Sequence, residues 1–176
     1  MVLVSTFNIS NNCNFRIEFQ ERAITFICFG YKIFALSKLR IAAKIIHFAP
    51  NDDGRRYTGM IQRYAFGSQC ITHEGRFAQT PKFVAESAAG RWLEPAFATH
   101  PKDAPPPQSP DEMNVANTSV MMNGGALYAL WEGGSAMQLD PETLQARGFK
   151  AWAPAYTGMA FSAHPKVEPR DGSLWN

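Results

Sequence analysis

The sequence has little cysteine, with three among 176 residues. So small and odd a number excludes a disulfide framework of the kind that stabilises small secreted domains. The sequence also has no CxxC pair, which would indicate a structural zinc site. We therefore expect a protein of a reducing compartment such as the cytoplasm.

An excess of either charge is also missing. Lys and Arg number 17 and Asp and Glu 15, so the net charge is +2. This balance creates no strong long-range field and excludes a general electrostatic role on nucleic acid or on a membrane surface. The basic pair Arg55-Arg56 is better explained as part of an exposed loop.

Long hydrophobic runs are absent. The most apolar stretch, residues 23–36, contains Lys32 and is shorter than the roughly 18 residues that a spanning helix needs. The N-terminus lacks the basic residues that precede the apolar part of a secretory signal. We expect residues 23–36 to form a buried strand or helix.

Familiar catalytic motifs are missing as well. The sequence has no HExxH pair, no nucleophile elbow and no phosphate-binding glycine loop. His47, His73 and His100 are most simply structural or solvent-exposed histidines. Cys70 and His73 are three residues apart, which on a strand places them on opposite faces and makes a shared metal improbable.

After residue 50 the sequence is typical of short strands joined by tight turns. Residues 67–69 separate two apolar runs, and Asn123-Gly124-Gly125 separates two more, so both places are predicted to be hairpins. Residues 140–143 and 170–173 have the composition of further turns. With no strong helix between these strands, we expect an all-β sandwich, barrel or propeller.

Two segments break this pattern. Residues 36–48 carry apolar residues at a spacing close to that of a helix, which favours a helix there. Residues 100–110 are rich in proline, which cannot donate to a β-ladder, so this stretch is predicted to be a surface loop. A proline-rich ligand for a partner domain is the weaker interpretation.

Two side chains stand out as candidates for chemistry. His164 lies at the end of residues 159–163, immediately before Pro165, where a strand end would fix the ring. Glu132 follows the apolar run of residues 126–131 and precedes two glycines. From the residues alone, a structural histidine and a solvated turn acid are the simpler interpretations. The alternative is an acid that hydrogen-bonds a metal-bound imidazole.

Five blocks of the sequence resemble the carotenoid cleavage oxygenase family in order and spacing: residues 117–120 (NTSV), 125–134 (GALYALWEGG), 139–144 (LDPETL), 161–169 (FSAHPKVEP) and 171–176 (DGSLWN). Shorter likenesses at residues 59–64, 75–77 and 80–83 extend the resemblance to residues 57–176. Of these blocks, the one around His164 is the most specific.

The resemblance implies a seven-bladed β-propeller with Fe(II) held on its axis by four histidines. Such enzymes use O2 to cleave a C=C bond of a conjugated substrate into two carbonyl products. By resemblance, His164 matches the first iron ligand, and Glu132 matches a glutamate that orients one of the other ligands. Neutral imidazoles suit Fe(II) and leave its charge available to O2 and substrate.

The resemblance also implies a domain division. Residues 1–50 do not resemble the family, whereas residues 51–176 match the N-terminal part of its propeller. We therefore expect an N-terminal fragment, an incomplete propeller whose other three iron-binding histidines are encoded beyond Asn176. One histidine binds iron weakly, so this chain alone should leave an apocarotenoid intact when supplied with Fe(II) and O2.

Trp131 and Phe161 are the candidates for substrate contact. Stilbene-cleaving relatives carry lysine immediately before the glutamate, where it can meet a phenolate, whereas Trp131 better suits a carotenoid or apocarotenoid. A stilbene or lignostilbene substrate remains an alternative, and so does a non-catalytic β-rich binding protein. A lipophilic substrate would also be consistent with peripheral membrane contact.

Overall fold

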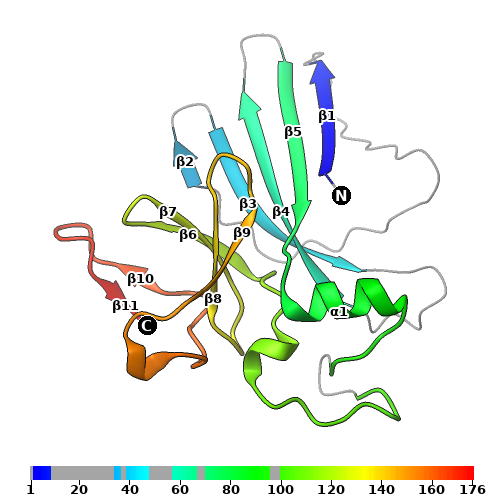
Figure 1. Ribbon diagram of the computed structural model, residues 1–176. Helices are drawn as coiled ribbons and strands as arrows, with labels where there is room; N and C mark the ends of the chain where they lie inside the picture. The colour runs from blue at the N-terminus through cyan, green and yellow to red at the C-terminus, as the bar shows by residue number, and fades with distance from the viewer. Residues whose placement is uncertain (1, 9–33, 37–38, 48–56, 67–69, 96–99) are drawn as a thin grey trace.

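The computed structural model describes residues 2–8, 34–36, 39–47, 57–66, 70–95 and 100–176. Two antiparallel sheets dominate this part of the chain, joined by a helical segment and followed by a small hairpin (Figure 1). The prediction of a fold built mainly from β-sheets is thus confirmed. None of the helices among the described residues has the length and apolar character needed to cross a membrane.

The first sheet has five strands in the order β1-β5-β4-β3-β2. Its central pair, β4 (Tyr57–Phe66) and β5 (Cys70–Phe77), is the first predicted hairpin. The other strands come from the first 50 residues: β1 (Val2–Asn8) pairs with β5, β3 (Leu39–His47) pairs with β4, and β2 (Phe34–Leu36) pairs with β3.

The predicted helix at residues 36–48 is therefore wrong, since β3 occupies most of this segment. His47 is accordingly a strand residue. Every position of β3 pairs with a residue of β4, so hydrogen bonding to a neighbouring strand overrides the helix-like spacing of its apolar residues. The interpretation of residues 23–36 concerns mostly residues outside those described.

The second sheet has the order β6-β7-β8-β9. Gly124 and Gly125, with φ of 55° and 77°, form the two-residue turn between β6 (Ser119–Asn123) and β7 (Ala126–Leu130), as predicted. The 140–143 turn likewise joins β8 (Ala136–Leu139) to β9 (Ala146–Lys150). Hydrogen bonds from the Arg147 side chain and the Thr143 amide lower the pKa of Asp140 in this turn.

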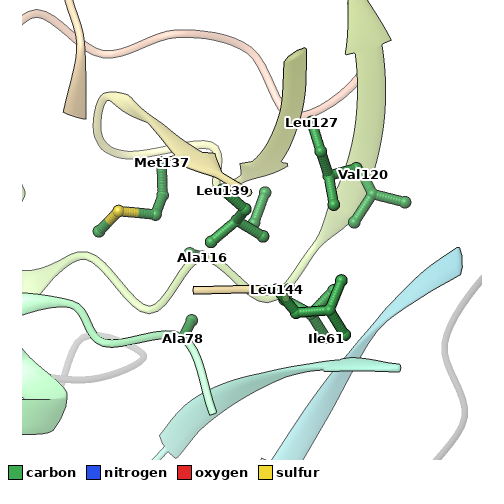
Figure 2. Packing of buried hydrophobic residues seen from close by; sticks show 9 residues of the cluster. Ile61, Ala78, Ala116, Val120, Leu127, Met137, Leu139 and Leu144 are labelled. Atoms are coloured by element: carbon green, nitrogen blue, oxygen red, sulfur yellow. The ribbon is translucent and has the colours of Figure 1, made fainter. Parts of the chain in front are cut away.

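Strands β6, β7 and β8 of the second sheet are largely buried on both faces, whereas β9 is partly exposed. One face packs its apolar residues against Ile61 of β4 and Ala78, forming the cluster in Figure 2. The opposite face packs Met121, Tyr128 and Leu130 against Phe161. Successive residues of β6 and β7 thus alternate between two cores, and each fully buried leucine contributes about 1.5–3 kcal/mol.

A helix that the sequence analysis missed connects the two sheets. In α1 (Pro81–Ala89), the Thr80 side chain accepts a hydrogen bond from the Phe83 amide, and Gly90 ends the helix with a φ of 65°. Lys82 and Glu86 form an ion pair on the buried face of this helix. The expectation of no strong helix after residue 50 is therefore wrong.

The remaining elements are short. The proline-rich stretch from His100 to Ser109 forms no helix or strand and leads into the 3-10 helix η1 (Pro110–Met113). A second 3-10 helix, η2 (Pro154–Tyr156), follows β9. The predicted turn at residues 170–173 joins β10 (Lys166–Val167) to β11 (Leu174–Trp175).

Candidate functional site

His164 and Glu132 are in direct contact. The imidazole Nε2 lies 3.1 Å from Glu132 Oε1, and both side chains are a little over half exposed, at 55% and 56%. Sequence reasoning expected Glu132 to orient a different ligand histidine, so its contact with His164 itself is new information from the structure.

Glu132 uses both carboxylate oxygens. While Oε1 faces the His164 ring, Oε2 accepts a hydrogen bond of 3.3 Å from the backbone amide of Ala163. The carboxylate therefore contacts both the ring and the backbone that carries it. An imidazole held in this way at one nitrogen is the usual arrangement of a metal-binding histidine, whose other nitrogen takes the metal.

The backbone before His164 is held from several sides. The Ser119 hydroxyl of β6 donates to the carbonyl of Ala163. The Ser162 hydroxyl accepts from the His164 amide at 3.0 Å, and Asn176 Oδ1 accepts from the Ser162 amide at 2.7 Å. Sequence reasoning did not identify these residues, because the Ser119 contact joins positions 44 apart in the chain.

Trp131 and Phe161, the two candidates for substrate contact, lie in different surroundings. Phe161 is 7% exposed and stacks on Trp152, with ring centroids 4.9 Å apart. Trp131 is half-buried and its ring covers the glycine turn that follows Glu132: a Cβ on Gly133 would lie 2.7 Å from Trp131 Cη2. Both rings thus have packing roles within this chain.

An aromatic group surrounds Phe161. Trp152 also contacts Tyr128 of β7, at 5.4 Å between ring centroids, and Lys150 Nζ lies 5.5 Å from the Trp152 ring centre. Burial raises the pKa of the Tyr128 hydroxyl above its usual value. These rings support the segment that runs towards His164.

Of the other histidines, His73 and His100 lie apart from His164, and the side chain of His47 is outside the described part of the structure. His73 is buried in β5 and stacks on Tyr64, with ring centroids 4.7 Å apart, and His100 is exposed in the proline-rich loop. Within the described ranges, no three His, Cys, Asp or Glu side chains come close enough together to hold a metal ion. The side chain of Cys70 lies outside the described part of the structure.

A family model and several curated proteins match this chain. Residues 57–176 match the family model described as retinal pigment epithelial membrane protein. The chain is 33% identical over 118 residues to lignostilbene-alpha,beta-dioxygenase isozyme III of Sphingomonas paucimobilis, a match covering 67% of this chain and 24% of that protein. It is 31% identical over 116 residues to isoeugenol monooxygenase of Pseudomonas putida, covering 66% and 24%.

A further relative is named as an apocarotenoid oxygenase. Apocarotenoid-15,15'-oxygenase of Synechocystis is 30% identical over 127 residues, covering 63% of this chain and 24% of that protein. The chain thus spans about a quarter of the length of these curated relatives.

Solved structures agree on the fold. The lignostilbene dioxygenase of Pseudomonas brassicacearum matches with a TM-score of 0.55 and 24% identity, over 81% of this chain and 30% of that one. A variant of the Synechocystis apocarotenoid oxygenase matches with a TM-score of 0.55 and 23% identity, over 73% and 29%.

Proposed function

Because the chain belongs to the carotenoid cleavage oxygenase family, we propose that its protein cleaves a conjugated C=C bond with O2, using Fe(II) bound in part by His164. The observation that carries the proposal is the Glu132 carboxylate, which contacts His164 Nε2 and the amide of the preceding residue. Names among the relatives include both dioxygenase and monooxygenase, so oxygenase chemistry is the level that they share.

The residues present fit one ligand position of an iron site, which the imidazole of His164 would fill. With Nε2 facing Glu132, the Nδ1 atom of His164 is left to donate to a metal, and the exposed ring is open to approach. When bound, Fe(II) supplies the ability to activate O2 next to an electron-rich double bond. Three further histidines would complete the proposed set, and within the described residues no such cluster surrounds His164.

Residues of this chain would prepare the ring for that role. Glu132 fixes the orientation of the imidazole and makes it a stronger donor. Ser119 and Ser162 bond the carbonyl and the amide of the peptide unit that joins Ala163 to His164, so that the ring projects from a fixed point. Precise support of this kind decides whether a ligand set is productive.

Carotenoids and apocarotenoids are the proposed substrates because Trp131 offers an apolar aromatic surface beside Glu132. A specific observation favours stilbenes as the second candidate: the dioxygenase that matches with 33% identity is named for lignostilbene. The non-catalytic alternative would hold if His164 bound no iron.

A chimera tests the metal role. Residues 57–176 would replace the matching segment of the Sphingomonas lignostilbene dioxygenase, and bound iron and C=C cleavage would be measured. We expect His164→Ala to abolish cleavage, and Glu132→Gln to lower iron affinity or activity by about 10–100-fold because the ring loses its carboxylate partner. His100→Ala, which removes an exposed loop histidine, is the matched control. Full activity of a folded His164→Ala chimera would contradict the proposal.

The same chimera tests the substrate. Relative to the unmodified host enzyme, we expect the chimera to cleave an apocarotenal faster compared with a hydroxystilbene. Trp131→Lys should shift this ratio back towards the stilbene, since an ammonium group can pair with a phenolate. Product aldehydes from each substrate would be quantified by chromatography. A stilbene preference in the chimera as strong as that of the unmodified host would contradict the carotenoid assignment while leaving the oxygenase chemistry in place.

A further inference from the structure

A polar cluster holds the chain directly after Glu132. Asp111 of η1 accepts hydrogen bonds from the Ser135 amide at 2.7 Å and from the Ser135 hydroxyl at 2.8 Å. Asn114 Nδ2 donates to Asp111 at 3.3 Å and to the Ser135 carbonyl at 2.8 Å. We call Asp111, Asn114 and Ser135 the Asp111 clamp.

The Asp111 clamp is built to be rigid. Asn114 and Ser135 are 0% and 2% exposed, and Asn114 Oδ1 also accepts the Ala116 amide at 3.0 Å. Hydrogen bonds to an ionised carboxylate are stronger than those between neutral groups. The cluster therefore fixes η1 and the backbone of residue 135 relative to each other.

Glycine at position 134 allows the close approach. A Cβ there would lie 2.6 Å from Asn114 Nδ2, 3.0 Å from Asp111 Oδ1 and 3.1 Å from Trp131 Cε3. The backbone of Gly134 is therefore enclosed between the Asp111 clamp and the Trp131 ring. This leaves the turn after Glu132 little freedom to move.

The same turn touches the approach to His164. The Gly134 carbonyl accepts a 2.9 Å hydrogen bond from the amide of Phe161, three residues before His164. On its other side the turn begins at Glu132. A fixed Gly134 thus determines both where the carboxylate begins and where the chain leading to the imidazole lies.

We propose that the Asp111 clamp is a positioning device that sets Glu132 against His164 and the Ala163 amide. Asp111, Asn114 and Ser135 are positioning residues, because they touch neither the ring nor the Glu132 carboxylate. The inference deepens the proposed function, on which its relevance to oxygenase chemistry rests. The positioning itself concerns only residues of this chain.

Amide hydrogen exchange at Ala163 tests the proposal, since this amide donates to Glu132 Oε2. In the metal-free 176-residue chain, we expect Asp111→Ala to speed exchange at Ala163 and Phe161 by about tenfold or more as their hydrogen bonds loosen. The Thr143 amide, which donates to Asp140 at 2.8 Å, should be unchanged. Asp171→Ala removes a carboxylate from a different turn and should leave Ala163 unaffected.

A conservative variant separates geometry from charge. Asp111→Asn keeps an oxygen for the Ser135 amide and offers an NH2 group to the Ser135 hydroxyl, so it should restore exchange at Ala163 to near the parent rate. Unchanged exchange at Ala163 in folded Asp111→Ala would overturn the proposal, as would an equal rise at Thr143. If Asp111→Ala does not fold, Ser135→Ala decides by the same comparison.

The measurement needs no iron, so it can succeed or fail independently of the proposed function. Faster Ala163 exchange in Asp111→Ala, together with full activity of the His164→Ala chimera, would support the Asp111 clamp and contradict the metal role. Unchanged Ala163 exchange in Asp111→Ala, together with loss of cleavage in the His164→Ala chimera, would contradict the Asp111 clamp and support the metal role.

Discussion

Replacing Lys82 by methionine is expected to lower the free energy of unfolding by about 3–5 kcal/mol, the usual cost of removing one partner of a buried ion pair. Lys82 is 1% exposed, and its ammonium donates to Glu86 and, at 3.2 Å, to the Glu94 carbonyl. Without it, the Glu86 carboxylate keeps the amides of Leu93 and Glu94 but loses the Lys82 ammonium. Urea titration followed by circular dichroism measures the change.

The matched control is Arg147→Met, which removes the cation of a more exposed pair with Asp140. Exposed pairs contribute little, so its unfolding midpoint should stay near that of the parent. A double variant, Lys82→Met with Glu86→Leu, should recover part of the lost stability because no charge stays buried. Equal effects of Lys82→Met and Arg147→Met would show that burial of the α1 pair does not matter.

We expect a second large effect from Gly59→Ala, which should lower the free energy of unfolding by about 3 kcal/mol through overpacking. A Cβ at this position of β4 would lie 2.2 Å from the Val115 carbonyl oxygen and 2.7 Å from that of Ala116. Both obstacles are backbone atoms, so relief requires the segment before β6 to move away from the first sheet. Thermal unfolding would report the loss.

Gly75→Ala on the neighbouring strand is the matched control. Its Cβ would meet Met60 Sδ at 2.9 Å, near the far end of a flexible side chain that can rotate aside. We expect a change below about 1 kcal/mol. If Gly59→Ala proved as mild as Gly75→Ala, the close contact between β4 and residues 115–116 would not be needed for stability.

Local sequence features predicted the tight turns well. At Gly124 and Gly125, both glycines adopt the positive φ values that such a turn requires. At residue 140, the side chain of Asp140 accepts amide hydrogen bonds from Glu142 and Thr143, as an Asx turn does. These structures depend on a few adjacent residues, so their composition was sufficient.

The two errors in secondary structure have different origins. For β3, the helix-like spacing of its apolar residues was misleading, because pairing with β4 decides the conformation and involves residues 10 to 26 positions away. For α1, the signals were present and overlooked: Thr80 before Pro81 marks a helix start, and Gly90 marks its end.

The candidate site was predicted only in part. The resemblance singled out His164 and Glu132, and the structure brings them together. It did not reveal the Asp111 clamp, whose members lie up to 24 positions apart and are ordinary polar residues in the sequence. Hydrogen bonds between distant loops leave no periodic pattern, so such support becomes visible only in three dimensions.

The order of the first sheet has a consequence for self-association. Its outer strands are β1, which pairs along seven positions with β5, and β2, which has three residues. Among the described strands, β2 presents a short outer edge to another chain, whereas the outer edge of β1 is longer and presents more backbone groups. We therefore expect aggregation by strand addition at this sheet to begin along β1 rather than β2. A proline substituted into β1 would oppose it, because proline cannot donate to a β-ladder.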